Sequence, residues 1–402
     1  MIALLGLALV VPLGAQTPAP PRTWTTTEGK TFQATLVGVQ GTQVTVRLGN
    51  GQLAAIGLPR LSPEDQAYVQ GLAKPAGGAA GSAPAATARS PIANRVWPQT
   101  VEVDSRAIEV SVVSEDPANQ KCVYRSRNFE FTTQDKIAPS LMKELARTFE
   151  ATRSLIEALP WGVHPKPPSG AAFFVARLFT TREDYIAAGG TSTSGAMFKS
   201  SDGSFLVPFK SLGLESRGKT WAKSAKFNDN LLVLEISKQM LFGSYSYLPQ
   251  WIWQGAPEYA GLLPDNAGVI HADAHERGVK EFIKHWSEHG IAPGDAGPVY
   301  VLMELPNEVW SQRMLADDKN RLRLQINSGL LVYYFCHLDG DGKGTRFLRF
   351  MDEIANAREA NIPPGARSSF GASQMEILLD GRTKEEMQKA VVEGFKKIGI
   401  HW

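Results

Sequence analysis

Residues 233–258 read VLEISKQMLFGSYSYLPQWIWQGAPE and predict two helices separated by a turn at Leu248-Pro249. In the zinc-binding helix motif H-E-x-x-H, two His side chains four residues apart hold the metal, and the Glu between them is the general base. This segment keeps the Glu as Glu235, but Leu234 and Lys238 occupy the two His positions. It therefore has the frame of a zinc site without the ligands.

The composition is that of an ordinary globular protein. The 402 residues are enough for two or three domains, and 43% of them are hydrophobic and 20% charged. The net charge of +2 and the absence of a long basic run predict no binding to nucleic acid. No apolar stretch after residue 20 approaches the ~20 residues of a membrane span, so we expect no integral membrane association.

The N-terminus has the pattern of an export signal. Residues 2–13 are apolar and are followed by Gly14-Ala15-Gln16 and a Pro-rich stretch. This predicts a signal peptide over residues 1–16 and a periplasmic or extracellular location, although a basic first region is missing. A membrane anchor is the alternative, but about a dozen apolar residues are short for one.

Two cysteines, Cys122 and Cys336, lie far apart in the sequence. In an oxidising compartment they could form a disulfide that stabilises the fold by a few kcal/mol. Alternatively, they are two buried thiols that act as small hydrophobic side chains. Neither their spacing nor their context indicates a bridge, which slightly favours buried thiols.

Residues 22–70 read as short β-strands separated by turns. Four alternating runs begin at Arg22, Thr31, Gln43 and Gln52, and Asn50-Gly51 is a strong hairpin signal. Residues 61–66 have a Ser at a helix N-cap position, then Pro and two acidic residues. The pattern predicts a small all-β barrel over residues 20–72, closed by one helical turn.

The same segment carries a set of spaced residues: Arg22-x-Trp24, Gly29-Lys30-x-Phe32, Val44-x-Val46, Asn50-Gly51, Leu58-x-x-Leu61-Ser62-x-x-Asp65-Gln66-x-Tyr68-Val69. In these residues it resembles the Sla homology domain 1, an SH3-like barrel that binds short Asn-Pro-Phe-type peptides in a yeast endocytic adaptor. Related copies occur in exported bacterial proteins. The resemblance implies core positions at Trp24, Phe32, Val44 and Leu61, and an unidentified peptide or protein ligand.

A segment rich in Ala, Gly, Pro and Ser at residues 73–95 predicts a solvated linker. Residues 96–402 then form one large domain. Its first half reads mainly as strands, with runs at 107–113, 122–131 and 171–179 and a hairpin that turns at Asp202-Gly203. Helical patterns follow the spans 139–158, 226–243, 250–262, 273–289, 320–337, 343–358 and 384–397.

Four short segments follow one another along this domain. They are Phe129-Glu-Phe, Leu178-Phe-Thr-Thr-Arg-Glu-Asp-Tyr, Val207-Pro208-Phe209, and Ser328-Gly-Leu-Leu-Val-Tyr-Tyr-Phe before Asp339-Gly-Asp-Gly. With the helix pair at 234–259, they resemble the peptidase MA (gluzincin) families over most of residues 120–360. The resemblance implies a zincin-like α+β fold for residues 96–402. In those families an acidic third ligand follows in a pattern like W-x-x-E-G-x-A-E-Y, and here Gln254 occupies its position.

The three replacements argue against zinc chemistry, because a catalytic zinc needs three protein ligands and an open water position. Leu234 offers no donor, Lys238 is a cation, and Gln254 is a weak neutral donor. We therefore expect no metal, no other cofactor and no catalytic residue. Glu235 and Lys238 can pair at i,i+3, while Leu234 would fill the vacated volume and Gln254 would form a hydrogen bond. Glu258 stands where family members orient a ligand His, and here it has none.

The cleft that holds the substrate in the peptidase families would then bind a peptide or protein in this chain. We expect strand 204–209 to be an edge strand that offers its backbone to an extended peptide. The candidate binding residues are Phe205, Val207, Phe209, Glu235, Trp251 and Tyr259.

Other metal-like patterns are weaker. His271 and His275, with Glu276 adjacent, and His285 and His289 are pairs four residues apart without a convincing third ligand. A solvated helix face explains them. Asp339-Gly340-Asp341-Gly342 lacks the length of a calcium loop and its final Glu, so a turn is sufficient.

Two functions are compatible with these patterns. The first is an exported, non-catalytic protein in which an SH3-like domain is joined to a pseudo-metallopeptidase domain with a binding or scaffold role. The alternative is a hydrolase with residual or altered activity that uses Glu235 and Lys238 or a relocated metal.

Overall fold

The computed structural model divides the chain into two compact units. It describes residues 22–27, 29–40, 43–48, 53–73, 90–104, 106–168, 170–192, 194–218, 220–224, 227, 230–245, 247–266, 268–359 and 375–402. The predicted signal peptide and most of the predicted linker lie outside these residues. The units are residues 1–88 with 363–368, and residues 89–362 with 369–402.

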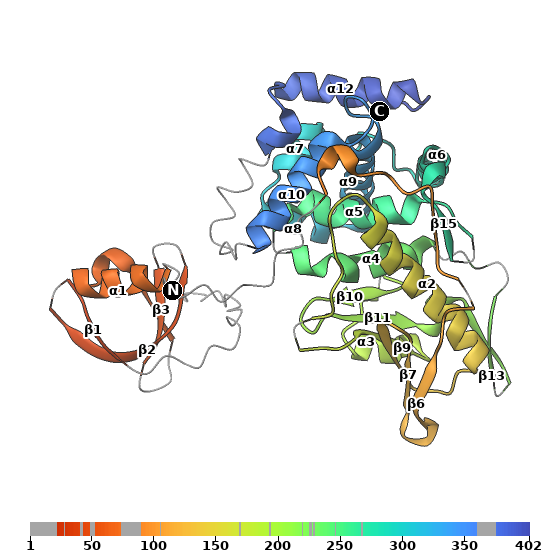
Figure 1. Cartoon of the computed structure of the whole chain (residues 1–402), viewed down its shortest axis with the longest axis horizontal. Helices are drawn as coiled ribbons and strands as arrows, with labels where there is room; N and C mark the ends of the chain where they lie inside the picture. Colours follow the sequence, from red (N-terminus) through yellow and green to blue (C-terminus); the bar gives the residue numbers. More distant parts are fainter. Residues whose placement is uncertain are drawn as a thin grey trace. The chain divides into compact units, whose positions relative to one another are not determined.

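The small unit is a four-stranded antiparallel sheet followed by a helix (Figure 1). Strands β1 (Arg22–Thr25), β2 (Thr31–Gln40), β3 (Gln43–Leu48) and β4 (Leu53–Gly57) pair in chain order. The four predicted strands are confirmed within a few residues. A 3-10 turn, η1 (Leu58–Arg60), leads to helix α1 (Pro63–Ala73), whose 11 residues far exceed the predicted single turn.

The core of the small unit is built around the predicted positions. Trp24, Val44 and Leu61 are buried, and Phe32 packs against them while partly exposed. Ser62 caps α1, since its hydroxyl oxygen accepts a hydrogen bond from the backbone N–H of Asp65 at 3.2 Å.

The large unit contains a six-stranded mixed sheet in the order β10-β11-β9-β8-β7-β6. Strands β11, β9 and β8 are parallel, and the outer pairings are antiparallel. Their bounds are β6 Ser111–Asp116, β7 Lys121–Arg125, β8 Phe129–Thr133, β9 Phe174–Phe179, β10 Met197–Lys199 and β11 Ser204–Pro208.

Two strand predictions in this sheet are wrong. Residues 122–131 are not one run, because the chain reverses between β7 and β8. The turn is held by the buried Glu150, which accepts hydrogen bonds from the Ser126 hydroxyl at 2.7 Å and the Asn128 backbone N–H at 2.9 Å. Residues 204–209 are not an edge strand either, since β11 pairs with β10 on one side and β9 on the other. The edges are β10 and β6.

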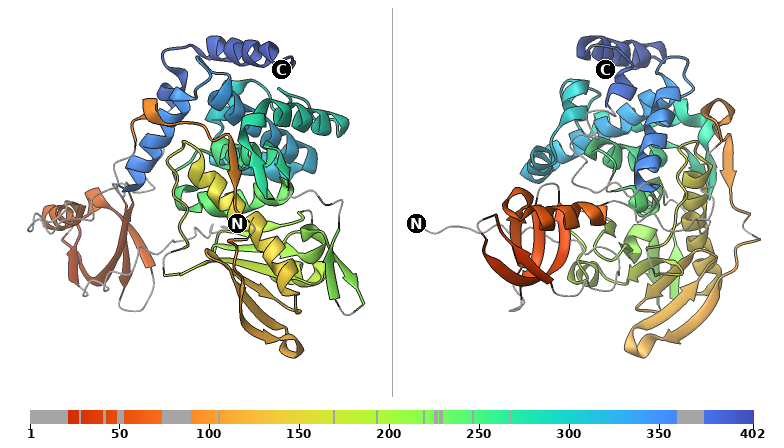
Figure 2. Two further views of the ribbon diagram at one scale, coloured as in Figure 1. Left: turned by 45° about the vertical axis from the view of Figure 1, so that its right-hand side comes forward. Right: turned by 60° about the vertical axis from the view of Figure 1, so that its left-hand side comes forward.

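Helices form the second half of the large unit, as predicted. Figures 1 and 2 show the sheet at one end of this unit and the C-terminal helices at the other. The helices with confirmed predictions are α2 Pro139–Ala158, α4 Asn230–Tyr245, α5 Gln250–Leu262, α6 His275–Glu288, α9 Asp318–His337, α10 Thr345–Glu359 and α12 Lys384–Lys397. A short helix, α3 Arg182–Ala187, lies between β9 and β10. Helices α7 (Val299–Glu304) and α8 (Asn307–Ala316) were not predicted; each follows a proline, Pro298 and Pro306.

Short elements complete the large unit. A hairpin joins β12 (Leu214–Arg217) to β13 (Thr220–Lys223), and β14 (Asp265–Asn266), β15 (Val269–His271) and β5 (Thr100–Glu102) form a small sheet. The 3-10 turns are η2 Ile92–Asn94, η3 Pro117–Asn119, η4 Phe209–Leu212 and η5 Ala272–Ala274.

Helix α2 packs on the sheet, and Phe149 is the aromatic residue at this contact. Phe149 contacts Phe129 and Phe131 of β8 and Phe205 of β11, with ring centroids 5.1–5.5 Å apart. These contacts are near perpendicular, a favoured geometry for aromatic pairs. The sheet face therefore forms a closed core beneath α2.

Helices α5 and α9 approach closely at two glycines. A Cβ on Gly255 would lie 2.3 Å from the backbone oxygen of Ser328, and a Cβ on Gly329 would lie 2.5 Å from the Cβ of Glu258. Any side chain there would push the helices apart. The two glycines thus place Glu258 directly against the backbone of α9.

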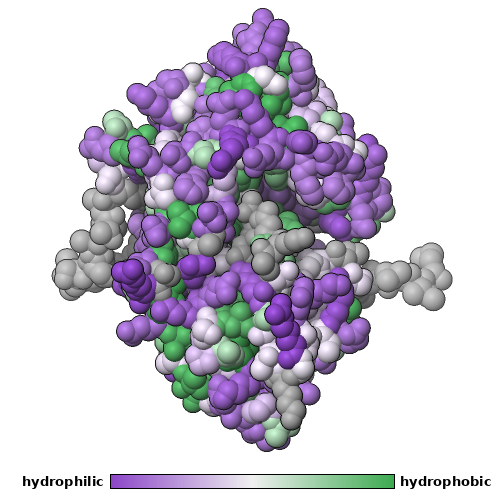
Figure 3. Space-filling model, turned by 90° about the vertical axis from the view of Figure 1, so that its right-hand side faces the viewer, coloured by the Kyte–Doolittle hydropathy of each residue, from purple (hydrophilic) through white to green (hydrophobic). Residues whose placement is uncertain are grey.

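Both cysteines are free and buried, so the structure has no disulfide between Cys122 and Cys336. The face of the molecule in Figure 3 is mostly hydrophilic, with hydrophobic residues in separate patches. Within the described part of the chain, no helix is both long and apolar enough to span a bilayer.

Candidate functional site

The middle of α4 carries an ion pair at the positions that the Glu and the second His have in the H-E-x-x-H motif. The Lys238 ammonium lies 2.8 Å from a carboxylate oxygen of Glu235 and donates a hydrogen bond to it. The two residues are one helical turn apart, which confirms that they can pair. Their side chains are 15% and 19% exposed, so the pair is largely shielded but open to solvent on one side.

The next helix supplies two polar residues one turn apart. On α5, the Gln254 side-chain oxygen accepts a hydrogen bond from the Gln325 amide of α9 at 3.4 Å, a long and weak bond. Glu258 is only 6% exposed. We call Glu235, Lys238, Gln254 and Glu258 the vestigial site.

Glu258 is a buried carboxylic acid. Among the described residues, its carboxyl group makes no hydrogen bond and no ion pair. Burial raises the pKa of Glu258 to about 7; the Lys238 charge opposes this rise and the Glu235 charge adds to it. The electrostatic coupling to both residues means that α4 and α5 bring the three charged groups within range of one another.

Leu234 was expected to fill the volume left by the metal. The structure leaves its side chain half-buried, beside Glu235 on α4. Part of the Leu234 side chain therefore remains open to solvent, and Leu234 is not a fully enclosed core residue.

The five apolar residues predicted to line the cleft lie in the core instead. Phe205, Val207, Phe209, Trp251 and Tyr259 are at most 1% exposed. Phe205 of β11 packs against Phe149 of α2. Trp251 contacts Phe335 of α9, and Tyr259 forms a hydrogen bond with His337 of α9. Of the candidate binding residues, only Glu235 is open to solvent.

A group of aromatic residues beside the vestigial site was not predicted. Phe198 of β10 lies 5.0 Å from Phe242 of α4 and 6.4 Å from Trp253 of α5, and Tyr245 of α4 lies 4.4 Å from Trp253, measured between ring centroids. Trp253 is 8% exposed and the other three are half-buried. We call these four residues the aromatic cluster. Two sequence signals were available: Phe242 follows Lys238 by one helical turn, and Trp253 precedes Gln254.

The His pairs do not form a metal site. His289 donates its Nδ1 hydrogen to the backbone oxygen of His285 at 2.8 Å, on the exposed face of α6. His275 turns inward and stacks on His337 of α9, with centroids 3.7 Å and planes 5° apart. In the described ranges, no group of three or more His, Cys, Asp or Glu side chains could hold a metal ion.

The stacked histidines are a buried polar cluster that the sequence did not indicate. A hydroxyl hydrogen bond joins Tyr259 to His337 at 2.8 Å, and another joins Tyr333 to His275 at 3.1 Å. Burial lowers the pKa of His275, and burial together with the neighbouring His275 lowers the pKa of His337 well below its usual value. Both imidazoles are therefore neutral at pH 7 and link α5, α6 and α9.

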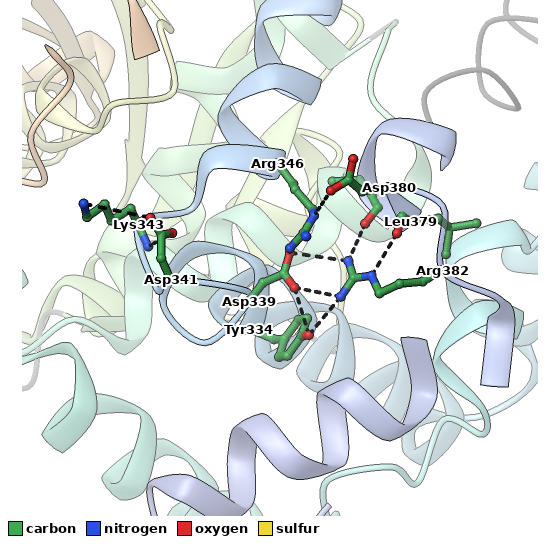
Figure 4. Close-up of polar contacts among 9 residues, drawn as sticks. Tyr334, Asp339, Asp341, Lys343, Arg346, Leu379, Asp380 and Arg382 are labelled. Carbon is green, nitrogen blue, oxygen red and sulfur yellow. Dashed lines mark hydrogen bonds and ion pairs between the residues drawn. The ribbon is translucent and has the colours of Figure 1, made fainter. Parts of the chain in front are cut away.

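The Asp339 turn is part of a network of ion pairs and hydrogen bonds within the protein rather than a calcium loop (Figure 4). The buried Asp339 carboxylate binds Arg382 at 2.8 Å and Arg346 at 3.1 Å, and accepts a hydrogen bond from the Tyr334 hydroxyl at 3.0 Å. Arg346 also pairs with Asp380 at 2.8 Å. Because its oxygens are already paired, Asp339 ties the end of α9 to the segment before α12.

No known protein family, no curated protein and no solved structure matches this chain.

Proposed function

We propose that the chain is an exported, non-catalytic protein in which a pseudo-metallopeptidase domain is joined to a peptide- or protein-binding SH3-like domain, with a binding or scaffold role. The zincin-like fold of the large unit and the barrel form of the small unit belong to this proposal, as does export. They rest on the sequence resemblances, on the order of a mixed sheet followed by helices, and on the four-stranded meander with its capped helix.

One observation carries the proposal: the Glu235–Lys238 ion pair places an ammonium at one of the three positions where a zinc ligand would be needed and binds it to the Glu of the motif. An ammonium repels a divalent cation, and here it neutralises the carboxylate that would have served as general base. Without a metal-activated water, Glu235 has no nucleophile to deprotonate.

A peptide ligand would lie along β10 rather than along residues 204–209. β10 is one of the two edge strands of the described sheet, so one side of its backbone does not pair within that sheet. It also carries Phe198 of the aromatic cluster next to α4. Strand addition at β10 would bring an extended peptide close to the vestigial site.

One observation favours the alternative, a hydrolase with altered activity. The pKa of Glu258, raised to about 7, is that of an acid or base working near neutral pH. Glu258 would then join Glu235 and Lys238 as a third proton-transferring group. This function predicts metal-independent hydrolysis that is lost in Glu258→Gln.

The test restores the three ligands. The variant Leu234→His/Lys238→His/Gln254→Glu should bind one equivalent of zinc, measured by metal analysis after dialysis, whereas the wild-type chain should hold only trace amounts. The double variant Leu234→His/Lys238→His is the matched control, and with one ligand fewer we expect it to bind zinc about tenfold or more weakly. Stoichiometric zinc in the large unit of the wild type would refute the proposed function.

A further inference from the structure

The vestigial site has more acidic than basic groups. Glu235 and Glu258 provide two carboxyl groups, and Lys238 provides one ammonium, which is already bound to Glu235 at 2.8 Å. Gln254, the fourth member, is neutral. Lys238 therefore acts on two carboxyl groups, and among the described residues Glu258 is the one that forms no ion pair.

Glu258 is also the best-buried member of the site. It is 6% exposed and has no bonded partner among the described residues. A buried acid without a hydrogen-bond donor is costly to ionise unless a positive charge arrives beside it. In the free protein the neutral acid is favoured. A cation that binds beside Glu258 would favour the ionised carboxylate, which then acts as its counter-ion.

The aromatic cluster supplies the second half of a cation site. Phe242 lies one helical turn from Lys238 on α4, and Phe198 contacts both Phe242 and Trp253 of α5, with ring centroids 5.0 Å and 6.4 Å apart. Half-buried aromatic faces attract ammonium and guanidinium groups and pack against the methylene chains that carry them. A compact hydrated metal ion would gain nothing from these rings, whereas an organic cation would.

We propose that the vestigial site binds an organic cation, a primary ammonium or guanidinium group of a ligand, with Glu258 as its counter-ion and the aromatic cluster against its apolar part. This inference rests on the proposed binding function of the same site. The cation can come from a basic side chain or from a free peptide N-terminus, and both present the same chemistry to Glu258.

Isothermal titration of the full chain with four small probes tests the inference. N-acetyl-lysine methylamide carries a side-chain ammonium, and phenylalanine amide carries a free α-ammonium. Their neutral counterparts are N-acetyl-norleucine methylamide and N-acetyl-phenylalanine amide. We expect at least one cationic probe to bind about tenfold or more tightly than its counterpart, and the probe that does so identifies the source of the cation. Equal affinities, or no binding by either cation, would overturn the inference.

Three variants show whether Glu258 is the counter-ion. Glu258→Gln should lower the affinity for the cationic probe about tenfold or more. Glu281 is an exposed residue of α6, and Glu281→Gln should leave this affinity unchanged. Lys238→Met should tighten binding, because it removes a competing charge and frees Glu235. Unchanged affinity in both site variants would contradict the assignment, and the Lys238→Met result decides the question if Glu258→Gln does not fold.

A further readout distinguishes a counter-ion from a merely structural acid. If the cation ionises Glu258, binding near pH 6 releases protons, and the apparent binding enthalpy then depends on the ionisation enthalpy of the buffer. The zinc content of the wild-type protein tests the proposed function separately from this binding experiment. Zinc-free protein that binds no cation would refute this inference alone, and zinc-loaded wild-type protein would refute the proposed function.

Discussion

Glu258 lies between the charged pair of α4 and the glycine surface of α9, and this position determines its protonation. Its pKa is raised from 4.5 to about 7, mainly by burial. The folded protein therefore holds a proton on Glu258 across a range of pH in which the unfolded chain has lost it.

The free energy of unfolding should fall as pH rises from about 4.5 to about 7, by about 3 kcal/mol from Glu258 alone. The sign follows because the folded state binds more protons than the unfolded state in this window. Glu258→Gln stays neutral, so urea denaturation should show wild-type stability at pH 4.5 and a gain over wild type at pH 8.

The quantity to compare is the difference in the free energy of unfolding between wild type and Glu258→Gln at each pH. The lowered pKa values of His275 and His337 produce the opposite trend, a loss of stability as pH falls below their unfolded value of about 6.5. That trend is common to wild type and Glu258→Gln and cancels. A constant difference between them from pH 4.5 to pH 8 would contradict the assigned protonation of Glu258.

At the scale of elements, the close packing of α5 on α9 holds the site together. Gly255→Ala should destabilise the protein by about 1–3 kcal/mol, because the new methyl group would meet the Ser328 backbone, which cannot move like a flexible side chain. Chemical denaturation measures the loss.

Gly243→Ala is the matched control, since Gly243 is exposed on α4 and a Cβ there would meet only the end of Arg358 at 3.6 Å. We expect that change to be neutral or to stabilise by up to about 1 kcal/mol through helix propensity. Equal effects of the two substitutions would show that helix propensity, and not packing, governs Gly255.

Elements also show where prediction from sequence ended. The 20-residue amphipathic pattern of α2 is confirmed at both ends, because local periodicity alone specifies it. The edge strand was misplaced, since an apolar run such as β11 looks the same with one paired neighbour or two. Strand order depends on contacts distant in the sequence, and those contacts make β10 the edge.

At the scale of the whole molecule, the chain has separate hydrophobic cores. The cluster around Trp24, Val44 and Leu61 shares no residue with the large core that contains Phe149 and Trp251. Residues 90–402 expressed alone should therefore fold and unfold with the midpoint of the corresponding transition of the full chain, within about 2 °C. Differential scanning calorimetry measures both proteins, and a fall of more than about 5 °C would mean that the small unit stabilises the large one.

The sequence by itself determined that residues 233–258 form two helices, that Glu235 and Lys238 share a helix face, and that zinc ligands are missing there. These properties depend on residue type and on spacing within a few turns. Only the tertiary structure decided that Phe205, Trp251 and Tyr259 belong to the core and that Phe198 lies beside α4. It also decided that Glu258 is buried with no hydrogen-bond partner among the residues that the structure describes. Burial and charge coupling depend on contacts between segments far apart in the chain. Local periodicity cannot predict them, because it reflects only neighbours within a few residues.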